Sequence, residues 1–398
     1  MKIALFSIGS LGDVMPFVRL GSHLKRHGHL VAFYGESRFA PLVEDYDLVF
    51  SGAIDIKVDP ARFLNEGMMN VLLERAVLDE MAERIDATFN GADLIVAHPM
   101  VTGFHPLAKA KQWPFVSMFT SPVFIPSIYN PPFDPKHPMA SKLASFSPVI
   151  AKMFLGITRQ KRKIMTQSYL DFAESVGDTS GLVWKDNVFS DHLNIGWFLS
   201  KLLPSKKGLP DKPFIFGFNP FDEKKLSKEA QDFINNPRDF ILVAMGSNHL
   251  PNIKEVITRA FMAAEKLGVR VAVLGANHFA HVAQAFESTP SAFFAMEPVT
   301  PLLERARMVV HHGGAGMTSE CALFGVPSVI VPLAFDQFKN AHRAKKLGIA
   351  SIATPDTTDK TILKAWNKPV EQLYDEIFAR KFIEDVIEAI ERIDEHVD

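Results

Sequence analysis

Short apolar runs alternate with helix-like stretches along most of the chain. In the first half, the apolar runs of strand length lie at residues 2–8, 30–35, 93–98 and 114–120. The segments between them include residues 9–29 and 105–112, whose composition favours helices. Strands that alternate with helices are typical of a parallel sheet covered by helices on both faces. The first half is therefore predicted to be a doubly wound α/β domain.

The same alternation begins again in the second half. Its strand-like segments lie at residues 239–248, 269–275, 291–296, 308–314 and 327–333. Each half opens with a strand that runs into a glycine, Gly9 in the first half and Gly246 in the second. The fold class that we expect is thus α/β, with two doubly wound Rossmann-like domains that face each other across a cleft.

The boundary between the two halves is predicted from a change in composition. Residues 201–221 contain four prolines and two glycines, which interrupt any helix and indicate a connection between domains. From the N-terminus, we expect an acceptor-binding domain at 1–204, a linker at 205–222, a donor-binding domain at 223–380 and a closing helix at 381–398. Helical periodicity over residues 381–396 supports the last of these.

Composition and charge narrow the class of protein. A chain of 398 residues has room for two domains, and 47% hydrophobic with 22% charged residues is typical of a globular protein with real cores. The formal net charge of -2 gives no electrostatic reason to expect nucleic acid as a partner. The single cysteine, Cys321, excludes an internal disulfide and suits a reducing compartment.

Segments for secretion or membrane insertion are not expected. The first apolar run ends in Gly9 after seven residues, so it indicates a strand and not a signal peptide. No window approaches the ~20 apolar residues of a membrane-spanning helix. We therefore expect a cytoplasmic protein.

The candidate chemistry centres on a glycine-rich turn that follows the strand at residues 308–310. His311 and His312 precede Gly313 and Gly314, and a helix is expected to begin near Gly316. Glycines let a backbone come close to a ligand, and the amides at the beginning of a helix favour an anion. His312 can donate a hydrogen bond to the same anion. This arrangement predicts a cradle for a diphosphate.

Polar residues downstream of the turn suit the rest of a nucleotide sugar. Glu320 falls in the early turns of the helix, where its carboxylate can accept hydrogen bonds from a ribose diol. Asp336 and Gln337 follow the next strand and can bind sugar hydroxyl groups.

The combined motifs resemble glycosyltransferase family 1, whose members use nucleotide sugars and have the two-domain GT-B fold. The stretch HHGGAG with FDQFKNA, residues 311–316 and 335–341, is most similar to the bacterial branch that acts on macrolides, glycopeptides and sterol-type acceptors. Residues 9–29 resemble that branch's first loop and helix. The resemblance covers the beginning of both domains and most of the C-terminal half.

The resemblance implies roles for individual residues on the donor side. His312 holds the diphosphate, and Gly314 and the amides from Gly316 to Thr318 surround it. Glu320 binds ribose, and Asp336 with Gln337 binds the donor sugar. Ser247 matches a glycine-serine pair near the phosphates.

The resemblance also implies the reaction. Asp13 matches a position at which this branch carries a carboxylate, which acts as the general base in an inverting displacement. The co-substrate is a UDP-sugar or a dTDP-sugar, and no cofactor is needed. We expect the diphosphate to leave without the help of a metal, on the premise that the chain has no Asp-x-Asp pair to bind one. Asp13 is also placed to cap the first helix, and the two roles do not exclude each other.

Two departures from the family pattern stand out. Met317 replaces a residue that usually carries a hydroxyl group, so we expect one side-chain contact with phosphate to be lost. Residues 295–303 match the region that holds the base but lack its stacking tryptophan, which leaves uracil and thymine open.

The acceptor side is less well marked. Residues 120–156 are rich in proline, aromatic and apolar side chains, and they lie where the resemblance places the acceptor pocket. A lipophilic small-molecule acceptor fits this composition. His98, which follows a strand, is a candidate to orient or assist Asp13 from the acceptor side. The basic run Arg159–Lys163 suits a solvated helix face, with weak contact to anionic lipid headgroups as the alternative.

Other functions remain open on the same fold. A sugar-nucleotide epimerase or a lipid-linked cell-wall glycosyltransferase is the alternative enzyme. From another class, the chain fits a catalytically silent auxiliary subunit that binds nucleotide. The sequence makes no prediction about the oligomeric state.

Overall fold

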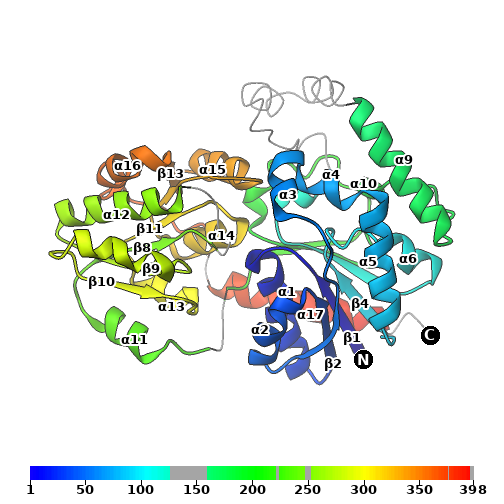
Figure 1. Ribbon diagram of the computed structural model, residues 1–398. Coiled ribbons are helices and arrows are strands. Elements are labelled where there is room, and N and C mark those ends of the chain that lie inside the picture. Colours follow the sequence, from blue (N-terminus) through cyan, green and yellow to red (C-terminus); the bar gives the residue numbers. More distant parts are fainter. Residues whose placement is uncertain (126–158, 221–223, 247–251, 375, 395–398) are drawn as a thin grey trace. The chain divides into compact units, whose positions relative to one another are not determined.

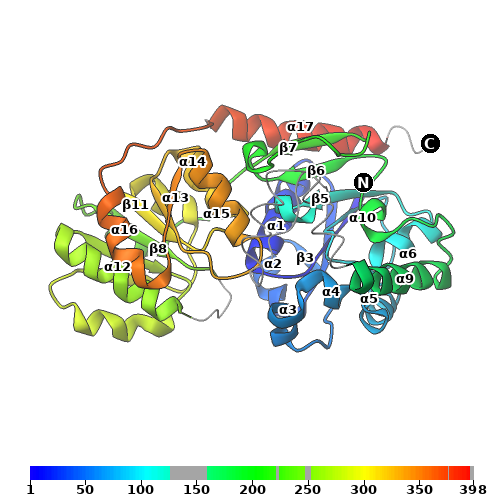
Figure 2. The ribbon, with the colours of Figure 1, turned by 90° about the horizontal axis from the view of Figure 1, so that it is seen from above.

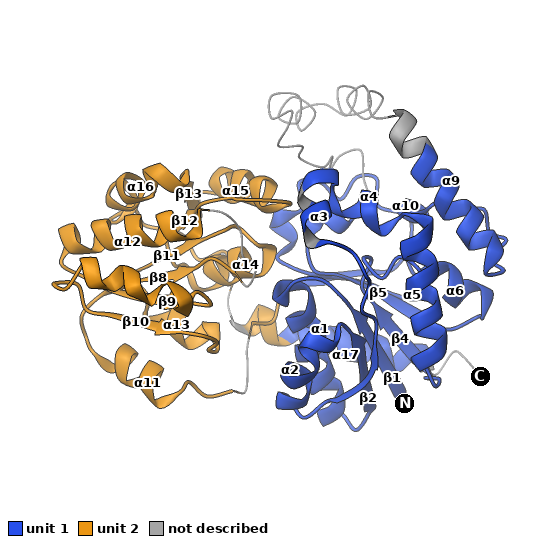
Figure 3. Cartoon of the chain, viewed as in Figure 1, with its two compact units in different colours: residues 1–217, 381–398 blue, residues 218–380 orange. Residues whose placement is uncertain are grey.

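The computed structural model describes residues 1–125, 159–220, 224–246, 252–374 and 376–394. Contacts within the chain divide it into two compact units, drawn in blue and orange in Figure 3. Unit 1 comprises Met1–Gly217 and Lys381–Asp398, and unit 2 comprises Phe218–Arg380. Each unit contains one parallel sheet with helices packed on it, which confirms the predicted α/β class with two Rossmann-like domains.

The sheet of unit 1 has seven strands in the order β3-β2-β1-β4-β5-β6-β7, and every neighbouring pair is parallel (Figure 1). The strands are β1 (Lys2–Ser7), β2 (Leu30–Gly35), β3 (Val49–Ala53), β4 (Leu94–Ala97), β5 (Phe115–Phe119), β6 (Asn194–Trp197) and β7 (Phe214–Gly217). The helices are α1 (Leu11–Arg26), α2 (Ala40–Asp45), α3 (Pro60–Glu66), α4 (Met68–Leu72), α5 (Arg75–Thr88), α6 (Phe104–Ala110), α9 (Arg159–Ser175) and α10 (Trp184–Asn187).

The segment expected to be a linker contributes to this sheet. Residues Phe214–Gly217 form β7, which pairs with β6 at the edge. Pro213 immediately precedes the strand. An edge strand tolerates proline at this position, because proline lacks only the backbone N–H donor. The apolar run between the prolines therefore forms a strand within residues 205–222.

The last helix also belongs largely to unit 1. Helix α17 runs over Glu376–Asp394, and from Lys381 onward it packs in unit 1 (Figure 2). The ring of Phe382 lies directly against Gly217 of β7 and contacts Trp197 of β6, with ring centroids 5.1 Å apart. Helix α17 thereby packs against β6 and β7 through Phe382.

The sheet of unit 2 has six parallel strands in the order β10-β9-β8-β11-β12-β13. The strands are β8 (Phe240–Ala244), β9 (Arg270–Leu274), β10 (Ser291–Phe294), β11 (Met308–His311), β12 (Ser328–Ile330) and β13 (Ala350–Ile352). The helices are α11 (Lys228–Asn235), α12 (Ile253–Leu267), α13 (Val299–Arg305), α14 (Ala315–Phe324), α15 (Gln337–Lys346) and α16 (Thr358–Ala365).

Both faces of this sheet are buried. Along β8, Ile241 and Val243 belong to the core formed with α12 and α16, whereas Leu242 belongs to the core formed with α11, α13 and α14. Alternate side chains of a strand point to opposite faces, so helices on both faces require a strand that is apolar throughout. This is why the strand segments appear in the sequence as uninterrupted apolar runs.

Candidate functional site

The strand order places a switch point in the sheet of unit 1. The neighbours β1 and β4 are separated along the chain by two strands and several helices, so the sheet grows outward in both directions from this pair. Open α/β sheets bind ligands beyond the C-terminal ends of the strands at such a point. Asp13 follows β1 and His98 follows β4, and Thr120 follows the next strand, β5. The structure therefore brings the two predicted residues, Asp13 and His98, close together, and it places Thr120 beside them.

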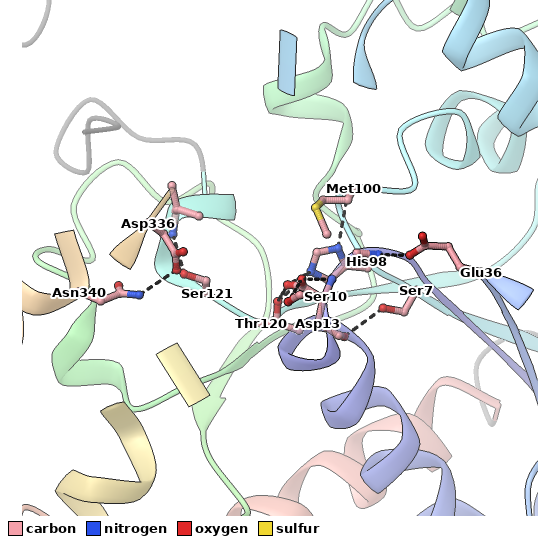
Figure 4. Close-up of polar contacts among 12 residues, drawn as sticks. Ser7, Ser10, Asp13, Glu36, His98, Met100, Thr120, Ser121, Asp336 and Asn340 are labelled. Carbon is pink, nitrogen blue, oxygen red and sulfur yellow. Dashed lines mark hydrogen bonds and ion pairs between the residues drawn. The ribbon is translucent and has the colours of Figure 1, made fainter. Parts of the chain in front are cut away.

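The carboxylate of Asp13 uses its two oxygens differently (Figure 4). Oδ2 accepts hydrogen bonds from the backbone N–H of Ser10 at 2.9 Å and from the Ser10 hydroxyl at 2.7 Å, so it caps the beginning of α1. Oδ1 faces Thr120, whose hydroxyl lies 3.0 Å away. Oδ2 therefore caps the helix, and Oδ1 is the oxygen that is the candidate general base.

Burial governs the acidity of this group. The Asp13 side chain is 15% exposed. Burial raises the pKa of Asp13 above its ordinary value, while the hydrogen bonds from Ser10 and Thr120 act in the opposite direction. A carboxylate with a raised pKa is a better general base near neutral pH than an ordinary surface aspartate.

The loop before Asp13 is held by glycine geometry and by an ion pair. Gly9 has φ of +119°, and a Cβ there would lie 2.8 Å from Oδ2 of Asp13. The Gly9 N–H donates to Oε2 of Glu36 at 2.8 Å, and Arg38 binds both Glu36 and the Gly9 carbonyl. Both polar groups of the Gly9 backbone are thus held in place next to the carboxylate.

Unit 2 has its own switch point, between β8 and β11. Gly246 follows β8, and His312 follows β11 and precedes α14. Gly246 and the predicted residue His312 thus lie beyond the C-terminal ends of neighbouring strands, where ligands of this class of sheet bind. Ser247, which was also predicted to lie near the phosphates, lies outside the described residues.

The imidazole of His312 occupies a slot that two glycines create. A Cβ on Gly246 would lie 2.9 Å from Cε1 of His312, and a Cβ on Gly314 would lie 2.7 Å from Nε2. Gly246 has φ of +82°, which also favours glycine. Burial lowers the pKa of His312, and the nearby carboxylate of Asp336 and the backbone of Ala244 partly offset this. The ring is therefore held in one place by its neighbours.

Helix α14 presents the amides of its first turn beside this ring. The first intrahelical bond is made by the Thr318 N–H, which donates to the Gly314 carbonyl at 3.0 Å, and the Thr318 hydroxyl donates to the same carbonyl at 2.8 Å. Thr318 is therefore engaged within the helix, and the amides of Ala315, Gly316 and Met317 precede it. A Cβ on Gly316 would meet no described atom within 4 Å, so this face is open.

Two other predicted donor-side residues, Met317 and Glu320, lie on α14 and are partly or fully buried. Met317 packs against the apolar core below α14, which accounts for an apolar residue at a position where a hydroxyl group was expected. Glu320 is 5% exposed and lies on the same helix.

The predicted sugar-binding pair lies at the beginning of α15. Asn340 ties this region to the glycine turn, because its Nδ2 donates to Oδ2 of Asp336 at 2.8 Å and to the carbonyl of Gly313 at 3.0 Å. Gln337 is buried, and its Oε1 accepts the N–H groups of Leu333 at 2.8 Å and Ala334 at 2.9 Å. Gln337 thereby holds the shape of the loop through its side-chain oxygen.

Sequence reasoning missed Thr120 and Asn340, and it noticed Gly246 without giving it a role. Thr120 ends the apolar run at 114–120, so the rule that ligands bind beyond strand ends could have found it. The slot around His312 has no comparable signal, because Gly246 is 66 residues away from it along the chain.

The acceptor side is only partly described. Residues 126–156 of the segment expected to form the acceptor pocket lie outside the described residues, as do the side chains of Arg159–Lys163.

The premise that the chain has no Asp-x-Asp pair is wrong, because Asp45, Tyr46 and Asp47 form one. Asp47 of this triplet is paired with Lys25 at 2.5 Å, and its side chain is 92% exposed.

The described residues contain neither a metal-binding cluster nor a membrane-spanning helix. Within the described ranges, no cluster of three or more histidine, cysteine, aspartate or glutamate side chains is arranged to hold a metal ion. None of the helices in the described part of the chain has the length and hydropathy needed to span a membrane.

Among the histidines that the structure describes, three are fully buried, and burial lowers the pKa of each to about 3: His98, His105 and His311. For His105, neither ring nitrogen has a hydrogen-bond partner among the described residues. An unfolded histidine has a pKa of about 6.5, so the unfolded state binds more protons between pH 6.5 and 3. The free energy of unfolding should therefore fall as the pH drops below about 6.5.

We expect His105→Leu to reduce this acid sensitivity. Each buried histidine contributes up to about 1.4 kcal/mol per pH unit below pH 6.5, so the variant should lose about that much slope. Urea unfolding between pH 5 and pH 7 measures it. His192→Leu, at an exposed histidine of the same unit, is the control. An unchanged slope in His105→Leu would contradict the assignment.

Comparisons with known proteins identify relatives that cover most of the chain. Residues 272–385 match the family model described as the C-terminal domain of erythromycin biosynthesis protein CIII-like proteins. The chain is 26% identical over 388 residues to O-mycaminosyltylonolide 6-deoxyallosyltransferase of Streptomyces fradiae, covering 89% of this chain and 86% of that protein.

A second group of relatives is longer than this chain. The sterol 3-beta-glucosyltransferase of Saccharomyces cerevisiae (strain YJM789) is 24% identical over 383 residues, which cover 87% of this chain and 31% of the relative. The chain thus spans about a third of the length of this sterol enzyme.

Solved structures share the fold. The glycosyltransferase of kitacinnamycin superposes with a TM-score of 0.73 at 20% identity, over 98% of both chains. The glycosyltransferase VinC, solved in complex with dTDP, gives a TM-score of 0.65 at 16% identity over the full length of both chains.

Proposed function

We propose that this chain, which belongs to glycosyltransferase family 1, transfers a sugar from a UDP- or dTDP-linked donor to a hydroxyl group of a lipophilic small molecule. Family membership makes the protein a glycosyltransferase of the GT-B type. The observation that carries the proposal is the arrangement after β11, where the His312 ring lies in its glycine slot beside the open first turn of α14. Helix amides and an imidazole together suit a diphosphate.

The proposed mechanism is a direct displacement with inversion. The Asp13 carboxylate takes the proton of the acceptor hydroxyl while that oxygen forms a bond to the anomeric carbon. The bond from this carbon to the diphosphate breaks, and its electron pair leaves with the nucleoside diphosphate. His312 and the amides of α14 stabilise the developing charge, and such preorganised donors are commonly the largest catalytic contribution.

The relatives support the two substrate classes. The structure of VinC contains dTDP, which supports a nucleoside diphosphate in this fold. One relative is named for a tylonolide acceptor and others for sterols, which supports a bulky, lipophilic acceptor. Asp336 and the NH₂ group of Gln337 are proposed to bind the donor sugar, and Glu320 to bind the ribose.

A calorimetric titration with UDP, dTDP, GDP and NAD tests the donor side. We expect binding of UDP or dTDP, after which the matching sugar donor is assayed against sterols and macrolide aglycones. Release of free nucleotide without any acceptor would indicate an epimerase instead. If none of the four nucleotides binds, a silent auxiliary protein explains the chain better.

Gly316→Ala tests the proposed diphosphate site without disturbing the fold. In the free protein the added methyl group meets open space, and alanine is favoured over glycine in a helix by about 1 kcal/mol. The melting temperature should therefore stay constant or rise. Binding of the nucleoside diphosphate should weaken at least several-fold, because the methyl group occupies the place where we expect phosphate. Unchanged nucleotide affinity would move the phosphate away from this turn.

A further inference from the structure

His98 lies next to Thr120, in the interior of unit 1. Its side chain is fully buried. The rings of Phe17 and Phe124 contact the imidazole edge-on, with centroids 5.8 Å and 4.8 Å away. Packing therefore fixes the orientation of the imidazole, and any influence that it has on a ligand passes through its hydrogen bonds.

The hydrogen bonds of His98 define which nitrogen carries the proton. The backbone N–H of Met100 donates to Nδ1 at 3.2 Å, so Nδ1 is an acceptor and carries no proton. In the neutral ring the proton is then on Nε2. Nε2 lies 2.8 Å from the hydroxyl oxygen of Thr120 and 3.8 Å from Oδ1 of Asp13, so its proton is donated to Thr120.

This donation orients the hydroxyl group of Thr120. The Thr120 oxygen accepts from His98, so its own proton is free to point at its other polar neighbour, Oδ1 of Asp13, at 3.0 Å. The hydrogen bonds thus run in one direction, from Met100 through His98 and Thr120 to Asp13 (Figure 4). Without the His98 donor, the Thr120 hydroxyl group could rotate, so that its proton would no longer point at Oδ1 of Asp13.

We propose that His98 and Thr120 are positioning residues for sugar transfer: His98 orients the Thr120 hydroxyl, which holds Oδ1 of Asp13 ionised and aimed at the acceptor. The inference rests on the proposed function in taking Asp13 as the base. Neither residue takes the proton that Asp13 removes from the acceptor. His98 stays neutral because burial lowers its pKa to about 3.

The other charged groups of this loop do not replace the pair. Glu36 and Arg38 bind each other and the backbone of Gly9, on the side of the loop next to the end of β2. Ser10 supports Oδ2 only. Among the described residues, Thr120 donates the hydrogen bond that Oδ1 accepts.

Thr120→Val tests the pair, because it removes the hydroxyl and keeps the shape. We expect kcat to fall about tenfold, with KM for the donor unchanged. The loss of a bond that lowers the pKa of Asp13 should also shift the acid limb of the kcat profile to higher pH. Thr120→Ser should restore both. Thr102→Val removes another buried hydroxyl of unit 1, which donates to the Leu72 carbonyl at 2.7 Å, and should change neither.

Nuclear magnetic resonance tests the geometry without any substrate. In the full chain labelled with ¹⁵N-histidine, the His98 signals, assigned with His98→Gln, should show a neutral ring protonated on Nε2 from pH 5 to 8. In the chain labelled with ¹³C-aspartate, the Asp13 carboxyl, assigned with Asp13→Asn, should titrate at higher pH in Thr120→Val. A proton on Nδ1, or an unshifted Asp13 titration, would overturn the inference.

The two proposals fail in different ways. If Asp13→Asn abolishes transfer while Thr120→Val and His98→Leu behave as wild type in rate and pH profile, the positioning role is wrong and the base stands. If Asp13→Asn keeps normal transfer, Asp13 is not the base, and the catalytic consequence proposed for His98 and Thr120 is overturned with it. His98→Gln retains a donor near the position of Nε2, so it should lose less activity than His98→Leu.

Discussion

Asp13→Asn is expected to slow sugar transfer by about 10²–10⁴-fold while nucleotide binding stays unchanged. The asparagine oxygen can still accept the Ser10 N–H, so the cap of α1 survives. What disappears is the group that takes the acceptor's proton. The variant therefore removes the base and leaves the cap of α1 in place.

Steady-state transfer rates and calorimetric nucleotide affinity measure the two effects. Wild-type transfer should also fall as the pH drops through the raised pKa of Asp13, because only the ionised carboxylate accepts a proton. This loss should occur above the ordinary aspartate range near pH 4. Transfer by Asp13→Asn within tenfold of wild type would leave Asp13 as a helix cap alone.

His312→Ala should weaken nucleoside diphosphate binding and reduce the transfer rate together. A hydrogen bond to a charged group contributes about 1.5–3 kcal/mol, which corresponds to a loss of about 10–150-fold in affinity. Calorimetry with UDP or dTDP measures it, and the melting temperature monitors the fold. Unchanged affinity would remove His312 from the diphosphate site.

The glycine slot offers a matched pair that does not alter the histidine. Gly246→Ala introduces a Cβ 2.9 Å from the His312 ring at φ of +82°. Gly268→Ala carries a similar backbone cost at φ of +67°, but its nearest neighbour is the end of Arg238 at 3.9 Å. Both variants should lose about 1–2 kcal/mol of stability. Only Gly246→Ala should also lose nucleotide affinity, because only it displaces His312.

The sequence predicted the elements of the fold well because strands buried on both faces are apolar throughout. The runs at residues 2–8 and 239–248 became β1 and β8, and the turn at His312 precedes α14 as expected. The interdomain segment was harder to interpret, since the few apolar residues of β7 are bracketed by prolines. Local patterns do not show that such a short run pairs at a sheet edge.

Individual side chains of the site depended more on tertiary structure. Gln337 was expected to bind a sugar, and the structure shows its Oε1 occupied by two backbone N–H groups of its own loop. Thr318 was expected to offer an amide to phosphate, and that amide is the first one used within α14. The sequence identifies residue types, but hydrogen-bond partners depend on where the backbone turns.

The sequence alone determined the alternation of strands and helices, the glycine turn with its histidine, and the carboxylate after the first strand. Each of these depends on residues that are neighbours along the chain. The tertiary structure decided which strands are adjacent, and hence that β1 meets β4 and β8 meets β11. It thereby placed Thr120 against Asp13, 107 residues away, and Gly246 against His312. The physical reason is that strand order follows from the packing of whole helices and sheets, and no local pattern encodes it.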